Sequence, residues 1–422
     1  MAATKLSRRA FFKRSTSDSW RLLWEAGPYY ERVVELLERA HSHAIFVGWQ
    51  IDSRIHLSTR RREEFRALVV RLCQQKPDFN IYFLMWDYAY FYAFEREALQ
   101  GWVWDSIHER VHFVFDNRHP YGGSHHEKLV VVDGETAFVG GVDICGDRWD
   151  SPEHLYEDGR RSLQHDQESH LPYHDLIVEV RGEVAADIAE HVGERWRGLS
   201  DVPFPVPRRL PPGGYPLLIS RTRARLEVQR PLLVRETEIL FRELIRLAQR
   251  QLIIENQYYW SGTINDELIA VMRARRGTGF RMLLVVPSAQ GGSFAFRMMG
   301  AVQTRLLDQL QQEAKETGTR LVFGCPFTLA SNQREKRVYV HSKVLIVDDR
   351  YLAIGSSNFN NRGFRLDSEL TLTLVGETPE LRDEISEHGK RVVCHWGQAA
   401  AADFEGGAAQ TAQAACSSIY LK

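Results

Sequence analysis

Two distant segments of the chain place a histidine and a lysine at one spacing and end on an aspartate. Each reads His-x-Lys-x-x-x-x-Asp, with four apolar residues between its lysine and its aspartate. Because side chains alternate along a strand, the histidine and lysine of each copy point to the same face. An imidazole beside an ammonium suits an anion, since lysine supplies positive charge and histidine acts as a nucleophile or an acid near neutral pH. The repeated residues are His126, Lys128 and Asp133 in the first copy and His341, Lys343 and Asp348 in the second. The doubling predicts one active site assembled from two halves of the chain.

The aspartate that ends each copy is predicted to organise a turn. Asp133 lies at an odd offset from His126, which puts it on the opposite face of the strand. Asp133-Gly134 is also a strong signal for a tight hairpin between two apolar runs, and Asp348-Asp349 is expected to turn in the same way. From spacing alone, both aspartates support the hairpin rather than touch a substrate.

A small polar cluster follows each predicted hairpin and is expected to form the floor of the pocket. The clusters are Gly140-Gly-Val-Asp143 and Gly355-Ser-Ser-Asn358. Small residues there would leave room for a ligand, and polar ones could hydrogen-bond it. The predicted cross-strand pairs are Asp143 with His126, Gly141 with Lys128, Asn358 with His341 and Ser356 with Lys343.

The segments around the two motifs repeat as well. In each half, two helical patterns and three apolar runs precede the motif, and a strand followed by a helix comes after it. Strands that alternate with helices are typical of an α/β fold, here made twice by duplication. The matching segments are 30–40 and 236–248, 44–47 and 252–255, 63–73 and 266–275, 81–84 and 282–286, 111–115 and 321–323, and 176–196 and 370–396.

Composition divides the chain into four parts. Residues 1–199 are predicted to form the first half and residues 217–397 the second. The proline-rich stretch 200–216 is predicted to be a linker, because proline at that density cannot continue a helix or a central strand. Residues 398–422 are rich in alanine and glutamine without periodicity and are expected to be disordered. Within the first half, residues 146–173 are predicted to form a long charged loop.

Charge and hydropathy restrict the classes of function. The 422 residues carry 54 basic and 55 acidic side chains, so the chain lacks the basic balance that nucleic-acid binding needs. Five cysteines without a CxxC pair favour a reducing compartment. No apolar run approaches the ~18 residues of a membrane span. Ser7 to Lys13 imitates a twin-arginine export signal, but polar residues follow it, so we expect a cytoplasmic protein or a peripheral one at a membrane surface rather than a secreted one.

Other histidine and aromatic clusters have simpler interpretations. A metal site at His119, His125, His126 and Glu127 is an alternative, but Lys128 would face the ion and repel it. A second cluster is expected to be a solvated loop rather than a ligand set: His154, His165, His170 and His174. An aromatic run is expected to fill the core, with an acyl-chain pocket as the alternative: Trp86, Tyr88, Tyr90, Phe91 and Tyr92.

The paired motif resembles the hallmark of the phospholipase D superfamily. The resemblance extends roughly from Trp20 to Trp396 and includes features of the eukaryotic-type branch. The segments that carry it are 125–143 with Gly146-Asp-Arg-Trp-Asp150, Ile254-Glu-Asn-Gln-Tyr-Tyr259, Tyr339-Val-His-Ser-Lys343, Gly355-Ser-Ser-Asn358 and Asp367-Ser-Glu369. It implies two α/β/α sandwich halves with mixed sheets, related by a pseudo-twofold axis, with the active site at their interface.

The resemblance also implies roles for the site residues. His126 would attack phosphorus and form a phosphohistidine, while His341 would protonate the leaving alcohol. Lys128, Lys343 and Asn358 would stabilise charge on the phosphoryl oxygens. The family counts Asp133 and Asp348 in its catalytic motif, so they stay in the candidate catalytic set beside the spacing argument, and Asp143 and Ser356 join the candidate phosphate-binding residues. No metal and no cofactor is required.

Each histidine is expected to need an acidic partner on its far nitrogen. In the family an acid on the following strand has this role, and the matching positions here are Asp175 and Glu369. Glu255 and Asn256 are weaker candidates for shaping the pocket.

The function implied is a phospholipase D that cleaves phosphatidylcholine-like lipids, with possible transfer to other alcohols. Its partner would be a phospholipid at a membrane surface, and the chain would act as a monomer with an internal pseudo-dimer. Three alternatives stay open: a phosphatidyltransferase of cardiolipin-synthase type, a nucleic-acid phosphodiesterase, and an inactive lipid-binding module. The near-zero net charge disfavours the second, and the intact paired motifs disfavour the third.

Overall fold

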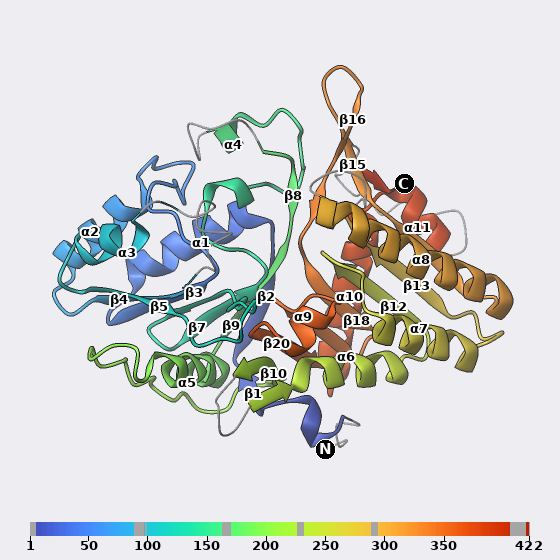
Figure 1. Cartoon of the computed structure of the whole chain (residues 1–422), viewed down its shortest axis with the longest axis horizontal. Helices are drawn as coiled ribbons and strands as arrows, with labels where there is room; N and C mark the ends of the chain where they lie inside the picture. The colour runs from blue at the N-terminus through green and yellow to red at the C-terminus, as the bar shows by residue number, and fades with distance from the viewer. Residues whose placement is uncertain are drawn as a thin grey trace.

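Two mixed β-sheets form the framework of the protein (Figure 1). The computed structural model describes residues 6–87, 97, 99–162, 170–225, 232–287, 294–405 and 419–421. The first sheet has the order β2-β9-β7-β6-β3-β4-β5. Its strands are β2 (Ser19–Trp24), β9 (Leu176–Arg181), β7 (Thr136–Gly140), β6 (Leu129–Val132), β3 (His43–Gly48), β4 (Asn80–Trp86) and β5 (Val111–Asp116).

The second sheet repeats this topology and extends it. Its order is β1-β10-β20-β19-β18-β12-β13-β14, and β11 (Leu232–Arg235) pairs with β10. Its strands are β1 (Lys13–Ser17), β10 (Tyr215–Arg225), β20 (Glu369–Val375), β19 (Tyr351–Gly355), β18 (Lys343–Val347), β12 (Gln251–Asn256), β13 (Arg281–Val285) and β14 (Arg320–Gly324). In both sheets three neighbouring strands are parallel and the remaining pairs are antiparallel. The α/β fold class and its duplication are therefore confirmed.

Helices cover both sheets because the central strands are apolar on both faces. Each face has to be buried away from water. One core cluster packs α1 and α2 on the first sheet, and a second packs α6, α7 and α8 on the second sheet. A third joins the other faces of both sheets to α5 and α10. Each half is thus an α/β/α sandwich. The helices are α1 (Ala26–Arg39), α2 (Phe65–Gln75), α3 (Gln100–Asp105), α5 (Glu183–Trp196), α6 (Glu236–Leu247), α7 (Gly262–Ala274), α8 (Phe294–Thr317) and α10 (Pro379–His395), with the short η1 (Arg8–Ala10), η3 (Gly146–Arg148), α4 (Gly159–Ser162) and α9 (Asn361–Arg365).

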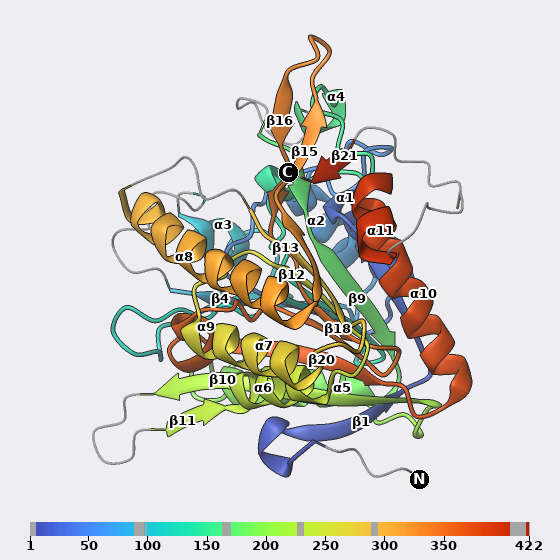
Figure 2. The same ribbon diagram turned by 90° about the vertical axis from the view of Figure 1, so that its right-hand side faces the viewer.

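The first residues of the chain belong to the second sheet. Strand β1 pairs antiparallel with β10, and Figure 2 shows it below β10 and beside η1. Leu6, Ala10 and Phe11 are buried in the outer core of the second half. The Nζ of Lys13 lies 2.6 Å from a carboxylate oxygen of Asp187, which ties β1 to α5 of the first half as well. The predicted boundary at residue 199 therefore does not hold for β1. The N-terminal segment packs its apolar side chains into the second half.

Part of the predicted disordered tail is ordered instead. Residues 398–405 form helix α11 (Gln398–Glu405), and residues 419–421 form β21 (Ile419–Leu421), while residues 406–418 lie outside the described part of the chain. Strand β21 pairs with β15 (Pro326–Leu329), which also pairs with β16 (Glu335–Arg337) in a small separate sheet (Figure 2). Ala400 and Phe404 are buried, and this apolar anchor is why the segment folds.

The loop that follows the first motif is less exposed than the sequence suggested. His154 and His174 are completely buried, which contradicts their assignment to a solvated loop. Aromatic and acidic side chains from distant segments surround them, and spacing within the loop gives no sign of that. His170 is only partly exposed, and His165 lies outside the described residues. Of the aromatic run, Trp86 is buried as core, and residues 88–92 also lie outside them.

Both motif hairpins turn through three residues, 133–135 and 348–350. Val132 pairs with Thr136, and Val347 pairs with Tyr351. The first loop residues, Asp133 and Asp348, adopt positive φ angles of 54° and 53°, which aspartate tolerates better than most residues. The predicted pairs would need four residues between the strands, with Ala137 opposite Val132 and Leu352 opposite Val347, so the observed register differs by one position and the predicted pairs of the two motifs are wrong.

The register makes Gly355 a sensitive position. A Cβ added to this glycine would lie 2.2 Å from the carbonyl oxygen of Leu370 on the neighbouring strand β20. Gly355→Ala is expected to destabilise the protein by about 1–3 kcal/mol, since backbone must move. Gly262→Ala is the matched control, because nothing lies within 4 Å of its added Cβ, and we expect it to be neutral or stabilising by about 0.4–1 kcal/mol. Urea denaturation of both variants measures the difference, and equal midpoints would contradict it.

Candidate active site

The two motif histidines lie where the two halves meet. His126 precedes β6 and His341 precedes β18. The backbone N–H of His126 donates to the carbonyl oxygen of Ser368 at 2.8 Å, and that of His341 donates to the carbonyl oxygen of His174 at 2.8 Å. The short parallel pair of β8 (Tyr173–His174) with β17 (Tyr339–Val340) continues the second contact. The same backbone arrangement thus occurs twice, as a pseudo-twofold axis requires.

Each histidine meets a carboxyl group from the opposite half. The Nδ1 of His126 lies 3.0 Å from Oε2 of Glu369, and the Nδ1 of His341 lies 2.7 Å from Oδ2 of Asp175. Both acids are buried. Asp175 and Glu369 are the two acids that the sequence singled out, but spacing gave no sign that the pairs cross between halves. With Nδ1 engaged, Nε2 is the ring nitrogen available for chemistry.

The two lysines are buried beside the histidines. The Nζ of Lys128 donates to the carbonyl oxygen of His126 at 2.9 Å and lies 3.3 Å from Oδ2 of Asp143. The Nζ of Lys343 lies 3.0 Å from Nδ1 of His341 and also donates to the carbonyl oxygen of that residue. Two buried ammonium groups at one interface give the site a preference for an anion.

The polar cluster residues have separate tasks. The backbone N–H of Trp49 donates to Oδ1 of Asp143 at 2.7 Å, so Asp143 bridges Lys128 and the end of β3. The hydroxyl of Ser356 donates to Oε2 of Glu369, the oxygen that also faces His126. Asn358 is buried, and its Oδ1 has no hydrogen-bond partner among the described residues. Buried polar atoms normally have a partner, so this amide is suited to bind a ligand.

The glycines do not leave room for a ligand in the way the sequence suggested. A Cβ added to Gly141 would lie 2.3 Å from Oδ2 of Asp175. The space beside Gly141 is therefore taken by the acid that faces His341. Gly355 makes room for the backbone of β20 in the same way.

The motif aspartates lie at the far ends of their strands and not in the site. Asp133 accepts hydrogen bonds from the backbone N–H groups of residues 41–43, and Asp348 accepts them from those of residues 249–251. Each aspartate fixes the start of the neighbouring antiparallel strand, β3 or β12. Their place in the candidate catalytic set is wrong on this geometry, and their predicted role as turn supports agrees with it.

Glu255 and Asn256 support the site from behind. Oε2 of Glu255 lies 3.0 Å from Nε2 of His174, and its Oε1 accepts from the indole of Trp396 at 2.7 Å. Oδ1 of Asn256 accepts from the backbone N–H of Phe359 at 2.9 Å. Neither contact is to a motif histidine or lysine.

The residues of the alternative metal site, His119, His125, His126 and Glu127, do not point toward one common position. Nε2 of His125 lies 3.3 Å from a carboxylate oxygen of Asp116. Glu127 points to His191 at 2.9 Å and to Arg195 at 2.6 Å. These contacts form a buried ion-pair network under β6, in which the glutamate is already paired with an arginine.

Arg148 and Tyr173 belong to the surroundings of His341, a placement that sequence reasoning did not assign. The Tyr173 ring centroid lies 5.2 Å from that of His341, and the Arg148 guanidinium lies 5.3 Å from the Tyr173 ring. The segment Gly146–Asp150 carried the signal, since it was among the motifs that supported the resemblance.

Burial dominates the ionisation of both histidines. Burial, followed by the charge of Lys128, holds the pKa of His126 well below its ordinary value. Burial, followed by the charge of Lys343, does the same to the pKa of His341. Both imidazoles are therefore neutral near pH 7, and a neutral imidazole is a nucleophile.

The neighbouring groups shift in the directions that burial dictates. Burial lowers the pKa of Lys343 to about 7, although Asp175 opposes the shift. Burial raises the pKa of Asp175 to about 7, with Lys343 opposing, and it raises the pKa of Glu369 well above the usual range. An anion bound beside the lysines would raise the pKa of Lys343 and His341 again, because it favours their charged forms.

Comparison with known proteins identifies relatives for both halves. A family model described as Phospholipase D matches residues 112–204, and one described as Cardiolipin synthase, PLD-like domain, matches residues 241–392. Phospholipase D1 of Saccharomyces cerevisiae is 26% identical over 67% of this chain and 22% of its own length. Cardiolipin synthase A of Pseudomonas putida is 29% identical over 61% of this chain and 46% of its own length.

A solved structure shows the same fold. The phosphatidylserine synthase of Haemophilus influenzae superposes with a TM-score of 0.61 over 91% of this chain and 88% of its own, at 15% identity. The chain spans much less of its curated relatives, with 22% of the yeast protein and 34% of Phospholipase D A of Dictyostelium discoideum covered.

The role of the motif aspartates can be measured directly. Asp133→Ala and Asp348→Ala each remove the acceptor of backbone N–H groups and are expected to cost about 1–3 kcal/mol of unfolding free energy. Because both side chains lie away from the histidines, we expect kcat at a permissive temperature to stay within about twofold. Asp349→Ala, which removes only a surface ion pair with Arg250, is the control and should change stability by less than about 1 kcal/mol. A large loss of kcat in a folded Asp133→Ala protein would restore the aspartate to the catalytic set.

Proposed function

Since the chain belongs to the phospholipase D superfamily, we propose that it cleaves the head-group phosphodiester of phosphatidylcholine-like glycerophospholipids. The products are phosphatidic acid and the free alcohol. The observation that carries the proposal is the crossed pair of histidines, each held at Nδ1 by a carboxyl group of the other half. Such a pair presents two reactive imidazoles to one phosphate.

In the first step, Nε2 of His126 attacks phosphorus. A P–N bond forms as the P–O bond to the alcohol breaks, and His341 gives its proton to the departing oxygen, which avoids expelling an alkoxide. His341 must be protonated for this, and the entering phosphodiester supplies the negative charge that favours its protonated form.

In the second step, His341 takes a proton from water. The hydroxyl oxygen attacks phosphorus, the P–N bond breaks, and His126 returns to its neutral state. Lys128, Lys343 and the amide of Asn358 stabilise the charge that develops on the phosphoryl oxygens in both steps. Asp175 and Glu369 hold each imidazole in the tautomer with its proton on Nδ1.

Phosphatidyl transfer is the second candidate. The same covalent intermediate would pass to an alcohol instead of water, and the match of residues 241–392 to a cardiolipin synthase domain favours this reaction. The fold shared with a phosphatidylserine synthase is consistent with it. The chemistry of the first step is identical for both candidates.

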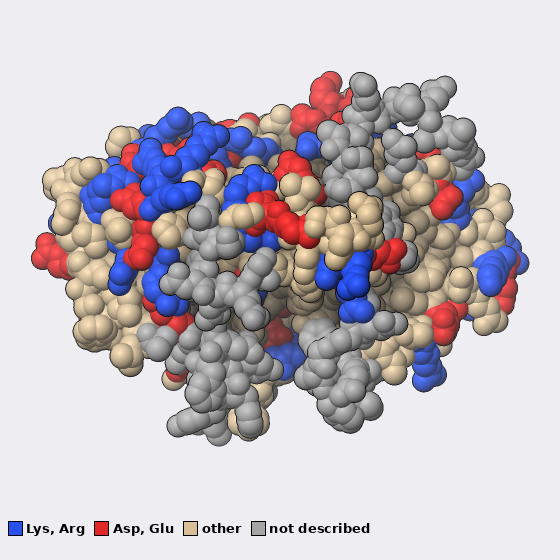
Figure 3. All heavy atoms as spheres, turned by 90° about the horizontal axis from the view of Figure 1, so that it is seen from above, with Lys and Arg blue, Asp and Glu red and all other residues tan. Residues whose placement is uncertain are grey.

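The surface favours a lipid over a nucleic acid. On the face shown in Figure 3, basic side chains gather at the upper left with acidic ones beside them, and elsewhere the two signs occur together. The net charge of the whole chain is -1, and nucleic-acid binding relies on an excess of positive charge. Among the described residues, none of the helices combines the length and apolarity needed to cross a bilayer.

The two histidines are distinguishable with an activated substrate. His126→Ala should lower turnover of phosphatidylcholine by about 10³-fold or more, and so should His341→Ala. With a phosphodiester whose leaving group needs no acid, such as a nitrophenyl ester, His341→Ala should still release a burst of nitrophenol and trap a phosphoenzyme. His126→Ala should show neither. A burst in His126→Ala, or its absence in a folded His341→Ala protein, would contradict the assigned roles.

The substrate class is tested with a panel of phospholipid vesicles and added ethanol. Purified protein should release phosphatidic acid, together with phosphatidylethanol that rises with ethanol concentration, because an alcohol competes with water for the intermediate. Glycerol or phosphatidylglycerol as a far better acceptor than water would favour transfer as the main reaction. Absence of any lipid product, with cleavage of DNA or RNA in parallel, would overturn the proposal.

A further inference from the structure

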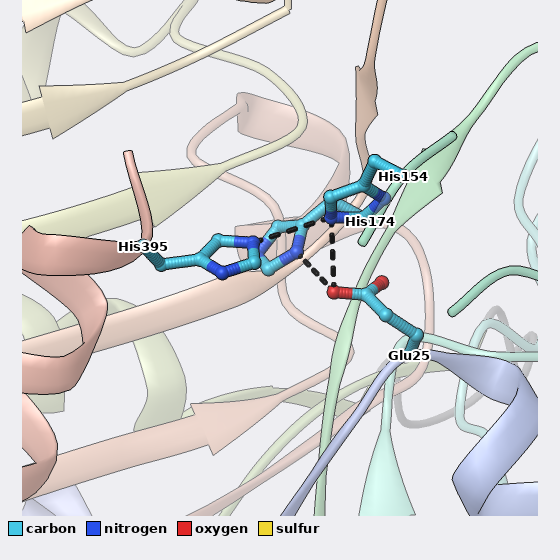
Figure 4. Close-up of side chains that lie close together, drawn as sticks. All are labelled: Glu25, His154, His174 and His395. Carbon is cyan, nitrogen blue, oxygen red and sulfur yellow. Dashed lines mark hydrogen bonds and ion pairs between the residues drawn. The ribbon is translucent and has the colours of Figure 1, made fainter. Parts of the chain in front are cut away.

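Four side chains that the phosphodiester chemistry does not use converge behind Asp175. They are Glu25, His154, His174 and His395 (Figure 4). Glu25 lies between β2 and α1, His154 lies in the loop after the first motif, His174 ends β8, and His395 ends α10 of the second half. Each offers one ligand atom, and the four atoms lie within 4.8 Å of one another.

The separations between these atoms match a small coordination sphere. Oε1 of Glu25 lies 2.7 Å from Nδ1 of His174 and 3.3 Å from Nε2 of His154. Nε2 of His154 lies 3.2 Å from Nε2 of His395. Zinc bound tetrahedrally by nitrogen and oxygen at its usual bond lengths separates its ligand atoms by about 3.3 Å. To hold an ion, Oε1 of Glu25 and Nδ1 of His174 would move apart, and the widest separation within the cluster, up to 4.8 Å, would close.

The outward nitrogens of two of the rings are held by further carboxylates. Nδ1 of His154 lies 2.7 Å from Oδ2 of Asp150, and Nε2 of His174 lies 3.0 Å from Oε2 of Glu255. In metal sites the ligating histidine typically donates its other N–H to a carboxylate, which fixes the ring and raises its basicity. The opposed nitrogens of both rings are thereby directed at Oε1 of Glu25.

Charge and surroundings agree with a divalent ion. Three buried carboxylates meet here, those of Glu25, Asp150 and Glu255, and the guanidinium of Arg161 lies 2.6 Å from Asp150. A divalent cation and this guanidinium would together neutralise the three carboxylates while all the imidazoles stay neutral. Buried charge requires such balance. The alternative is a metal-free network in which two of the imidazoles are doubly protonated and positively charged.

We propose that Glu25, His154, His174 and His395 bind one Zn²⁺ as a structural site. The imidazole-rich donor set, with one carboxylate, suits zinc better than a hard ion such as Mg²⁺. Four protein ligands close the coordination sphere, so the site is structural rather than catalytic. His395 is partly exposed, which gives the ion a path to the cluster.

The site would hold the acid that faces His341. Oε2 of Glu25 accepts a hydrogen bond from the backbone N–H of Asp175 at 2.9 Å. The carbonyl oxygen of His174 accepts one from the backbone N–H of His341. Zinc would also link the two halves, because His395 comes from the second half and the other three ligands from the first. The ligands are therefore positioning residues for the active site, two contacts removed from the phosphate.

Metal content is measured on the full chain, independently of turnover, so a failure of the proposed lipid activity leaves this test intact. Protein produced with zinc in the medium should retain about one zinc ion per chain after dialysis. Exchange with Co²⁺ should give the strong visible absorption of tetrahedral cobalt. Removing zinc with a chelator should lower Tm by at least about 2–4 °C, since the ion binds only the folded state.

Cysteine variants on helix α10 provide a spectroscopic test that needs only a folded protein. His395→Cys should retain the metal and give Co²⁺-loaded protein a new thiolate-to-metal charge-transfer band. His388→Cys is the matched control, because His388 lies on the same helix against Trp20, outside the cluster, and it should keep the wild-type cobalt spectrum. Wild-type protein that holds no zinc, takes up no Co²⁺ and keeps its Tm with chelator would establish the metal-free network instead. A cobalt spectrum unchanged by His395→Cys would equally overturn the proposed ligand set.

Discussion

Two buried carboxyl–imidazole pairs fix how the two halves dock. Each pair takes its histidine from one half and its acid from the other. A buried carboxyl group is costly unless it has hydrogen-bonding partners, and the imidazole that each acid meets belongs to the other half. Gly141 lacks a Cβ because Asp175 occupies that space, and Ser356 donates to the oxygen of Glu369 that faces His126. The register of both hairpins has to deliver these small residues to the same interface. The halves are therefore joined by the requirements of the site itself, in addition to their shared core.

The pseudo-twofold symmetry of the backbone is broken by the side chains. One half supplies Asp175 and the other Glu369, and the cluster position that is Asp143 in the first half is Asn358 in the second. Asp143 is already paired with Lys128, whereas Oδ1 of Asn358 has no hydrogen-bond partner among the described residues. Duplicated scaffolding with unequal environments is what a two-step displacement needs, since one imidazole must attack while the other transfers a proton.

Sequence patterns were sufficient for the strands and helices that repeat in the two halves, but not for the contacts between the halves. Apolar runs such as 44–47 and 252–255 mark central strands, because strands that are buried on both faces consist mostly of apolar residues. The cross-strand register was missed by one position, since each hairpin turns through three residues, with Asp133 or Asp348 at a left-handed backbone angle, and the predicted pairs require four. The crossing of Asp175 to His341 depends on docking two domains, which no spacing within a domain encodes. His154 looked exposed because its neighbours in sequence are polar, yet Glu25 and His395 bury it from segments far away.

Strand β1 has a consequence for how the chain is made. Its partner β10 is synthesised some two hundred residues later, whereas β2 and β9 of the first sheet are complete well before that. The first half can therefore complete its own sheet before β10 is made, whereas β1 can pair only after β10 is made. Domains generally fold in the order of their synthesis, so the pairing of β1 with β10 belongs to the stage at which the two halves assemble. Halves produced as separate chains, divided at the proline-rich stretch, would carry β1 on the first chain and its partner β10 on the second.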